Sequence, residues 1–184
     1  MIKKPLHEAC SVLKMSQTDL VAIAHFFKKI EEIKQIPDPD ERIYELIEII
    51  SVDCKKDEFK CISEQLMSFV QNVYNEQLEV KYQSGIDQAM QEGDFQAIVK
   101  YYELAVDFKT TRNYAASCFN DLISHGIKSL HFGLDPFKVF TEISKIEIKE
   151  LVTPLLKAQV LQRCIEETLI PGEVPKKKTE LALA

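Results

Sequence analysis

The residues best suited to chemistry are a few histidines and cysteines that lie close together in the sequence. His7 and Cys10 stand three positions apart, a spacing that would place both on one helical face, where they could hold a metal or pair a thiol with a base. His125 and His131 flank a second stretch and would matter if a cleft formed there. No second Cys/His pair completes the first set, so we expect no metal site. An enzyme that uses His125 and His131 is kept as an alternative.

Motifs that mark the common catalytic devices are absent from the sequence. It contains no glycine-rich phosphate loop, no Gly-x-Ser-x-Gly elbow and no His-Glu-x-x-His pair. Asp38, Asp40 and Glu41 form the densest acidic group near a turn, but this stretch lacks the central glycine of an EF-hand loop. We therefore expect a protein that is not an enzyme and that needs no cofactor.

Aromatic side chains are concentrated between residues 95 and 119. If the helices there form a stack of hairpins, only about half of each helix can face inward. The remaining aromatic side chains could then line a groove that accepts a helix or peptide, as aromatic anchors often do. On this reasoning we predict that Tyr101, Tyr102, Phe108 and Tyr114 bind a partner.

The elements that must position these residues are predicted to be helices throughout. The chain has 184 residues, of which 46% are hydrophobic and 28% charged, with only 5 glycines and 7 prolines. So few glycines and prolines argue against β-sandwiches, β-barrels and open α/β folds, because the turns of these folds usually need such residues. Apolar residues recur at spacings of three and four almost everywhere. We expect an all-α fold with seven to nine amphipathic helices in a bundle or a short hairpin stack.

Four helix starts carry recognisable capping residues. Ser16 with Asp19 forms a capping box, and Asp40 is expected to cap the helix after the prolines at 37 and 39. Asp135-Pro136 and Thr153-Pro154 each place a cap directly before a proline at the first helical position.

Glycines and polar residues predict where the helices end. Gly93 and Gly126 are expected at helix C-termini, and residues 110–112 are expected to form a turn. The long helix before Gly93 is expected to break near Gly85.

Apolar residues at helical spacing are predicted to form the core. They are Leu20, Ile23, Phe27, Ile30, Ile33, Ile43, Leu46, Ile47, Ile50, Phe59, Ile62, Leu66, Phe69, Val73, Phe95, Ile98, Tyr102, Ala105, Phe137, Phe140, Ile143, Leu155, Leu156, Val160, Leu161, Cys164 and Ile165.

The stretch that begins at Gly93 carries a family pattern. Gly93, Asp94, Phe95, Tyr102 and Ala105 stand where the second helix of a tetratricopeptide repeat has Gly-Asp-Tyr followed by Tyr and Ala. Over about residues 78–126 the chain therefore resembles a tetratricopeptide-like helical hairpin, and the resemblance implies a helical module that binds proteins. The sequence departs from the family at Ile98, where alanine is usual, and it lacks the proline after the second helix.

Domain organisation follows from the same boundaries. We expect a single helical domain over residues 1–170, with a hinge near 126–135, and a flexible C-terminal tail over 171–184.

Charge and cysteine usage narrow the partners. The net charge of −6 opposes binding to nucleic acid. The sequence has no run of about 20 apolar residues, so we expect no insertion into a membrane. Five scattered cysteines without a secretory signal favour a cytoplasmic location. We expect a non-catalytic helical module, an adaptor, scaffold or assembly subunit, that binds another protein through an aromatic-lined groove. The alternatives are a small acidic chaperone for a secreted or assembling client protein and an enzyme with an unrecognised site in a helical bundle, and a homodimer is left open.

Overall fold

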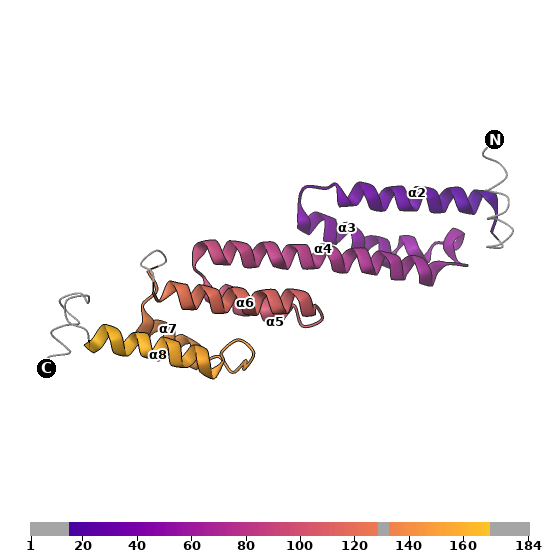
Figure 1. The fold of residues 1–184 in the computed structure, drawn as a ribbon. Coiled ribbons are helices and arrows are strands. Elements are labelled where there is room, and N and C mark those ends of the chain that lie inside the picture. Colours follow the sequence, from indigo (N-terminus) through magenta and orange to yellow (C-terminus); the bar gives the residue numbers. More distant parts are fainter. Residues whose placement is uncertain (1–14, 129–132, 170–184) are drawn as a thin grey trace. The chain divides into compact units, whose positions relative to one another are not determined.

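The fold is all-α, as the sequence predicted. A computed structural model describes residues 15–128 and 133–169, and these form seven α-helices and no strand (Figure 1). The helices are α2 (Gln17–Lys34), α3 (Pro39–Ser51), α4 (Ser63–Glu92), α5 (Phe95–Leu104), α6 (Lys109–Gly126), α7 (Pro136–Ser144) and α8 (Pro154–Leu169). Two short 3-10 turns, η1 (Asp53–Lys55) and η2 (Asp57–Phe59), connect α3 to α4.

The packing divides the chain into two compact units, Met1–Lys81 and Tyr82–Ala184. Helix α4 runs through the boundary, so its first part belongs to unit 1 and its last part to unit 2. Each unit has its own core. The single helical domain expected over residues 1–170 therefore stays a prediction, namely that the two units unfold together. The predicted tail over 171–184 and the middle of the predicted hinge, residues 129–132, lie outside the described residues.

Unit 1 is built by α2, α3, the 3-10 turns and the first part of α4. The Ser16 capping box is confirmed: its hydroxyl accepts the Asp19 backbone N–H at 3.1 Å, and the Asp19 carboxylate accepts the Ser16 N–H at 3.2 Å. The cap of α3 was predicted two residues too late. Asp38, not Asp40, caps it, because Pro39 takes the first helical position. The buried core is Phe26, Ile30, Ile33, Leu46, Ile49, Cys54, Phe59, Leu66, Val70 and Val73.

Several predicted core residues of unit 1 lie at the surface instead. Phe26 is buried, whereas Phe27 is 39% exposed and its ring packs edge-on against that of Phe69, with 5.0 Å between centroids. In α3, Ile49 is buried and Ile47 is exposed. A helix that contacts two neighbours buries the part of its surface that faces them. The spacing of apolar residues shows that such a face exists but does not show where its centre lies.

An ion cluster joins α2 to the turn after α3. The Asp53 carboxylate lies 2.9 Å from Lys29 Nζ and 2.8 Å from Lys56 Nζ. Partial burial acts to raise the pKa of Asp53, but hydrogen bonds and charge from Lys56 and Lys29 outweigh it and hold the pKa below its ordinary value of 3.8.

This lowered pKa predicts how stability depends on pH. The stabilisation by ionised Asp53 is fully present above pH 3.8, and it is lost as the pH falls through the lower pKa of the folded state. We expect the free energy of unfolding of Asp53→Asn to fall less steeply than that of the wild type as the pH drops below 3.8. Urea titrations between pH 6 and 3 measure this, and parallel curves would contradict it.

Unit 2 contains the last part of α4 and helices α5 to α8. Its buried core is Ile86, Ala89, Phe95, Ile98, Val99, Tyr102, Ala115, Cys118, Phe119, Leu122, Ile123, Ile127, Val139, Ile143, Leu151, Val152, Leu156, Val160 and Cys164. Helix α4 ends at Glu92 as predicted, and Gly93 follows with a φ of 71°, a left-handed conformation that favours glycine. The turn predicted at 110–112 is wrong. Helix α6 already begins at Lys109, because Ala105 and Phe108 close the turn with backbone hydrogen bonds.

Helix α4 does not break at Gly85, contrary to the prediction. The helix is continuous from Ser63 to Glu92, and Gly85 has a packing role there. A Cβ at this position would collide with the ring of Tyr101, whose Cε2 atom would be 2.7 Å away. Glycine therefore lets α5 approach α4 closely.

Substituting Gly85 tests this close approach. Alanine is a better helix former by about 1 kcal/mol, but overpacking typically costs about 1–3 kcal/mol. Because the Tyr101 ring is itself held against Tyr82, we expect Gly85→Ala to lower the free energy of unfolding by about 1 kcal/mol or more. Urea unfolding measures the difference, with Ser84→Ala on the exposed side of the same helix as the neutral control. A more stable Gly85→Ala variant would show that the ring moves aside freely.

Candidate functional site

Two of the four predicted partner-binding residues lie near each other in unit 2. The ring of Tyr82 packs against both Tyr101 and Phe108, with centroid separations of 6.2 and 6.1 Å. Tyr101 and Phe108 are half-buried. This aromatic cluster joins the last part of α4 to α5 and to the start of α6, so its contacts explain helix packing.

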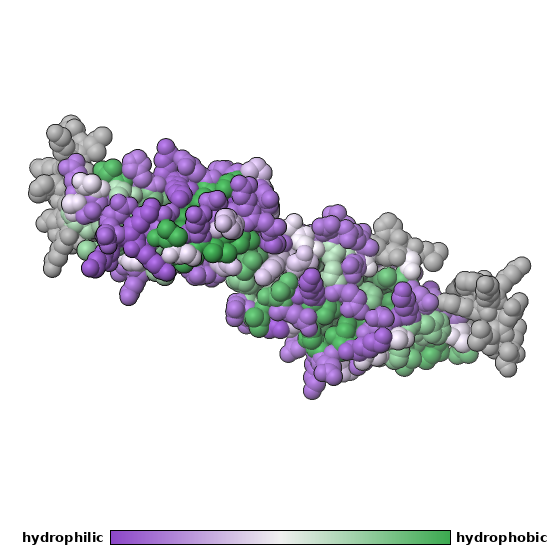
Figure 2. Space-filling view, turned by 180° about the vertical axis from the view of Figure 1, so that it is seen from behind, coloured by the Kyte–Doolittle hydropathy of each residue, from purple (hydrophilic) through white to green (hydrophobic). Residues whose placement is uncertain are grey.

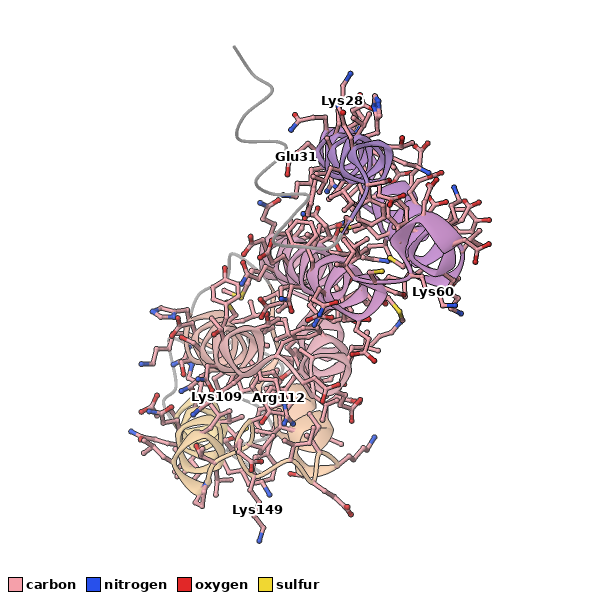
Figure 3. The ribbon with its side chains drawn as sticks, turned by 90° about the vertical axis from the view of Figure 1, so that its right-hand side faces the viewer. Lys28, Glu31, Lys60, Lys109, Arg112 and Lys149 are labelled. Carbon is pink, nitrogen blue, oxygen red and sulfur yellow. The ribbon has the colours of Figure 1, made fainter. Side chains whose placement is uncertain are left out.

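Tyr102 is a core residue, as its helical spacing also predicted. Its side chain is 5% exposed, and the guanidinium carbon of Arg112 lies 4.2 Å from the ring centroid. Figure 3 labels Arg112, which belongs to α6. The Arg112 Nε atom is buried and has no hydrogen-bond partner among the described residues. Since the core and the Arg112 guanidinium enclose the ring, Tyr102 offers almost no surface to a partner.

Tyr114 lies on α6 and is 39% exposed. Its hydroxyl donates a hydrogen bond to Oδ1 of Asp87 on α4. That bond to a carboxylate, with a contribution from burial, raises the pKa of Tyr114 well above its ordinary value of 10.0. The hydroxyl is therefore protonated at neutral pH and is used to join two helices.

The residues considered for catalysis are not assembled into a site in the described structure. His125 is exposed at the end of α6, and its Nδ1 lies 2.8 Å from the backbone oxygen of Asp121. His7, Cys10 and His131 lie outside the described residues. Within residues 15–128 and 133–169, no three His, Cys, Asp or Glu side chains are grouped as metal ligands would be.

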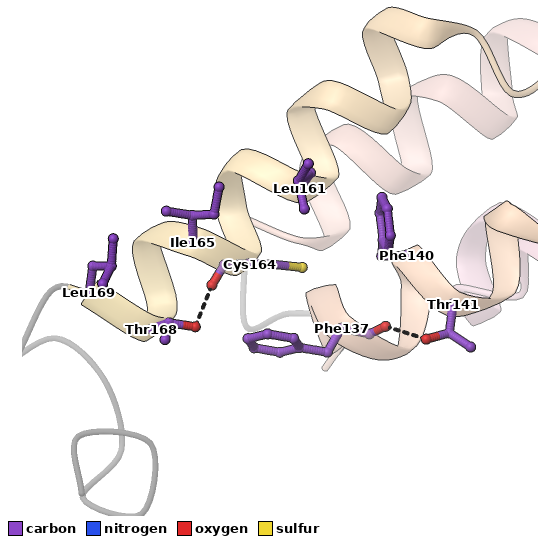
Figure 4. A pocket seen from close by; sticks show the side chains of 8 residues that line it. All are labelled: Phe137, Phe140, Thr141, Leu161, Cys164, Ile165, Thr168 and Leu169. Carbon is purple, nitrogen blue, oxygen red and sulfur yellow. Dashed lines mark hydrogen bonds between the residues drawn. The ribbon is translucent and has the colours of Figure 1, made fainter. Parts of the chain in front are cut away.

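A groove lies between α7 and α8 in unit 2 (Figure 4). Its volume is about 420 Å³, and its lining is Phe137, Phe140, Thr141, Leu161, Cys164, Ile165, Thr168 and Leu169. We call this feature the α7–α8 groove. Both helices that form it start as the sequence predicted, at the caps Asp135 and Thr153, whose side chains accept backbone N–H groups at 3.0 and 3.1 Å.

Large apolar side chains of the groove are open to solvent. The exposed fractions are 42% for Phe137, 45% for Leu161, 48% for Ile165 and 66% for Leu169. Figure 2 shows green hydrophobic side chains at the surface of both units, among purple hydrophilic ones. Single exposed apolar residues are ordinary on protein surfaces, but a contiguous set that lines a concave surface is typical of binding sites.

The two polar side chains of the groove are already satisfied. The hydroxyl of Thr141 donates to the backbone oxygen of Phe137 at 3.0 Å, and that of Thr168 donates to the backbone oxygen of Cys164 at 2.8 Å (Figure 4). Since both hydroxyl protons are used within their own helices, the groove presents almost only apolar surface.

Sequence reasoning missed this groove because it assigned the groove residues to the core. Phe137, Leu161 and Ile165 were predicted to be buried but are exposed, whereas their neighbours Val139, Val160 and Cys164 are buried. Leu155, which was also predicted to be buried, is 68% exposed. A signal was present in α8, where the apolar positions cover a wider arc than one helix contact can bury. That excess indicated an apolar face without a partner among the described helices.

A smaller hollow lies in unit 1 between α3 and α4. Its volume is about 260 Å³, and it is lined by Ile47, Ile50, Ser51, Gln71 and Tyr74. Polar side chains make up part of its lining, so it is a less selective surface for apolar ligands than the α7–α8 groove.

Comparison of the chain with protein-family models, curated proteins and solved structures finds no match. None of the helices within the described ranges combines the length and hydropathy that a membrane crossing requires. The fold class is all-α, and the α7–α8 groove is the site from which a function can be argued.

Proposed function

We propose that this chain is a non-catalytic helical module that binds another protein, with the α7–α8 groove as its binding surface. The observation that carries the proposal is the contiguous apolar lining, in which Phe137, Leu161, Ile165 and Leu169 are each 42–66% exposed. Keeping such side chains in water is costly, since full burial of one is worth about 1.5–3 kcal/mol. A partner that covers the groove would recover this free energy.

The proposed role is still the adaptor, scaffold or assembly subunit expected from the sequence. The binding surface is now the α7–α8 groove and no longer the predicted aromatic groove. Tyr101, Phe108 and Tyr114 contact other helices of their own unit, and Tyr102 is buried. The tetratricopeptide-like resemblance over residues 78–126 and the cytoplasmic location belong to the same proposal as expectations.

Site-specific photo-crosslinking tests the surface. A benzoylphenylalanine residue replaces Ile165 in the groove, and in a matched chain it replaces Leu155, which is 68% exposed on the same helix but does not line the groove. Illumination in the cells that make the protein is expected to give a discrete protein adduct from position 165 and none from position 155. The adduct should disappear when Leu161→Gln is added. No adduct from position 165, or equal adducts from both, would overturn the proposal.

A further inference from the structure

The α7–α8 groove lies at the end of the described part of the chain. Leu169 is the last residue of α8 and lines the groove, as do Leu161 and Ile165 before it. These three side chains recur every four residues and form a stripe about 12 Å long at 1.5 Å per residue (Figure 4). Residues 170–184 therefore start at the groove itself.

The first residues after α8 are of the types that reverse the direction of a chain. Ile170 precedes a proline, which disfavours continuation of the helix. Pro171 and Gly172 are the residues preferred at the two central positions of a type II turn. A reversal there directs the following residues back along α8. Residues 173–184 span about 40 Å when extended, which is more than enough to cover the stripe.

Large apolar side chains recur near the end of this segment. Leu181 and Leu183 alternate with Ala182 and Ala184. In an extended segment, residues two apart project from the same side, so both leucines can enter the groove while the alanines face outward. This arrangement takes apolar surface of the leucines and of the groove out of water together, which favours the covered state.

The charges at the end of α8 complement the segment. Arg163 is shared by the carboxylates of Glu166 at 3.5 Å and Glu167 at 3.7 Å, so these three residues carry one net negative charge. The carboxyl end of a helix is itself partly negative. Lys138 of α7 does not line the groove. Residues 176–178 are three lysines that stand between the turn and the leucines, so charge as well as apolar surface attracts the segment.

We propose that residues 170–184 fold back along α8 and that Leu181 and Leu183 occupy the α7–α8 groove, where they compete with the partner. A segment tethered this closely acts at an effective concentration on the order of millimolar. The partner binds only those chains whose groove is uncovered, so its apparent affinity falls with their fraction. The competition rests on the proposed function, whereas the occupation of the groove by this segment does not.

Photo-crosslinking within the purified full chain tests the occupant. Benzoylphenylalanine replaces Ile165 in the groove. In a matched chain it replaces Gln162, which is exposed on the same helix within one turn of Ile165 but does not line the groove. Illumination without any partner is expected to join position 165 to residues 174–184 of the same chain, and mass spectrometry of the digested protein locates the bond. Position 162 should give little or none of this product.

Variants of the segment show which side chains hold it. The Leu181→Gln, Leu183→Gln chain should give about fivefold less crosslink from position 165, because the segment loses both apolar anchors. Thr179→Gln, a change between the lysines and the leucines, is the matched control and should leave the yield unchanged. Lys176→Glu with Lys178→Glu should lower the yield about twofold or more, and added salt should weaken this effect.

The affinity of the partner reports the competition separately. The partner captured at position 165 in cells should bind the Leu181→Gln, Leu183→Gln chain about threefold or more tightly than the wild type, because more chains have an uncovered groove. Calorimetry with the full chain measures both dissociation constants, and the Thr179→Gln chain should bind like the wild type.

The outcomes that overturn each part are distinguishable. Equal yields from positions 165 and 162, or no crosslink from position 165 to residues 174–184, would refute the occupant and leave the proposed function standing. A crosslink between two chains, detected by mixing isotope-labelled and unlabelled protein, would make a second copy the occupant. A crosslink within one chain with unchanged partner affinity would refute the competition. The absence of a partner adduct in cells would refute the proposed function and leave the folded-back segment standing.

Discussion

Tyr102→Ala is expected to lower the free energy of unfolding by about 3–5 kcal/mol, the range typical when a large aromatic side chain is removed from a core. The ring is 5% exposed among the helices of unit 2, and the Arg112 guanidinium stacks on it. Removing the ring leaves a cavity beside the partly buried guanidinium of Arg112. The Nε atom of that guanidinium already lacks a hydrogen-bond partner among the described residues. Thermal and urea unfolding measure the change.

Two controls separate the ring from the hydroxyl and from the surface. Tyr102→Phe keeps the ring under Arg112 and is expected to change stability by less than about 1.5 kcal/mol, as volume-conserving changes usually do. Tyr44→Ala removes a tyrosine that is 66% exposed and should lie within about 0.5 kcal/mol of the wild type. A Tyr102→Ala protein as stable as the wild type would mean that the ring is not in the core.

The second large effect concerns the two packing units. Leu46→Ala removes a fully buried side chain from the core of unit 1 and is expected to cost about 2–5 kcal/mol. If the units open separately, amide hydrogens of α2 and α3 should exchange at least about thirtyfold faster, while those of α5 and α6 keep their protection. Hydrogen exchange with mass spectrometry reads both regions in one sample.

Leu122→Ala provides the mirror experiment, because Leu122 is 1% exposed in the core of unit 2. It should accelerate exchange in α5 and α6 and leave α2 and α3 protected. If either variant accelerates exchange everywhere to the same extent, the two units unfold together as the single domain expected from the sequence.

Helix starts were the most predictable part of the fold. Ser16, Asp135 and Thr153 cap helices where the sequence placed them, since a cap depends on a few adjacent residues. The α3 start shows the limit of such local rules. Two aspartates flank Pro39, and the proline's preference for the first helical position decides in favour of Asp38.

The candidate site was less predictable, because it depends on which helices face each other. Helical spacing identified Phe137 and Ile165 as apolar-face residues but could not show that neighbouring helices leave them 42% and 48% exposed. Likewise, the sequence predicted a helix break at Gly85, whereas the glycine makes room for the ring of Tyr101. Contacts between elements distant in the sequence carry this information, and spacing along one helix does not.

The affinity of the partner captured at position 165 for three forms of the full chain tests the central claim most directly. The forms are the wild type, the Leu161→Gln, Ile165→Gln variant and the Leu155→Gln control, and calorimetry measures each dissociation constant. If the α7–α8 groove is the binding surface, the groove variant should bind at least tenfold more weakly, and the control should bind like the wild type. Equal affinity of all three forms would contradict the account.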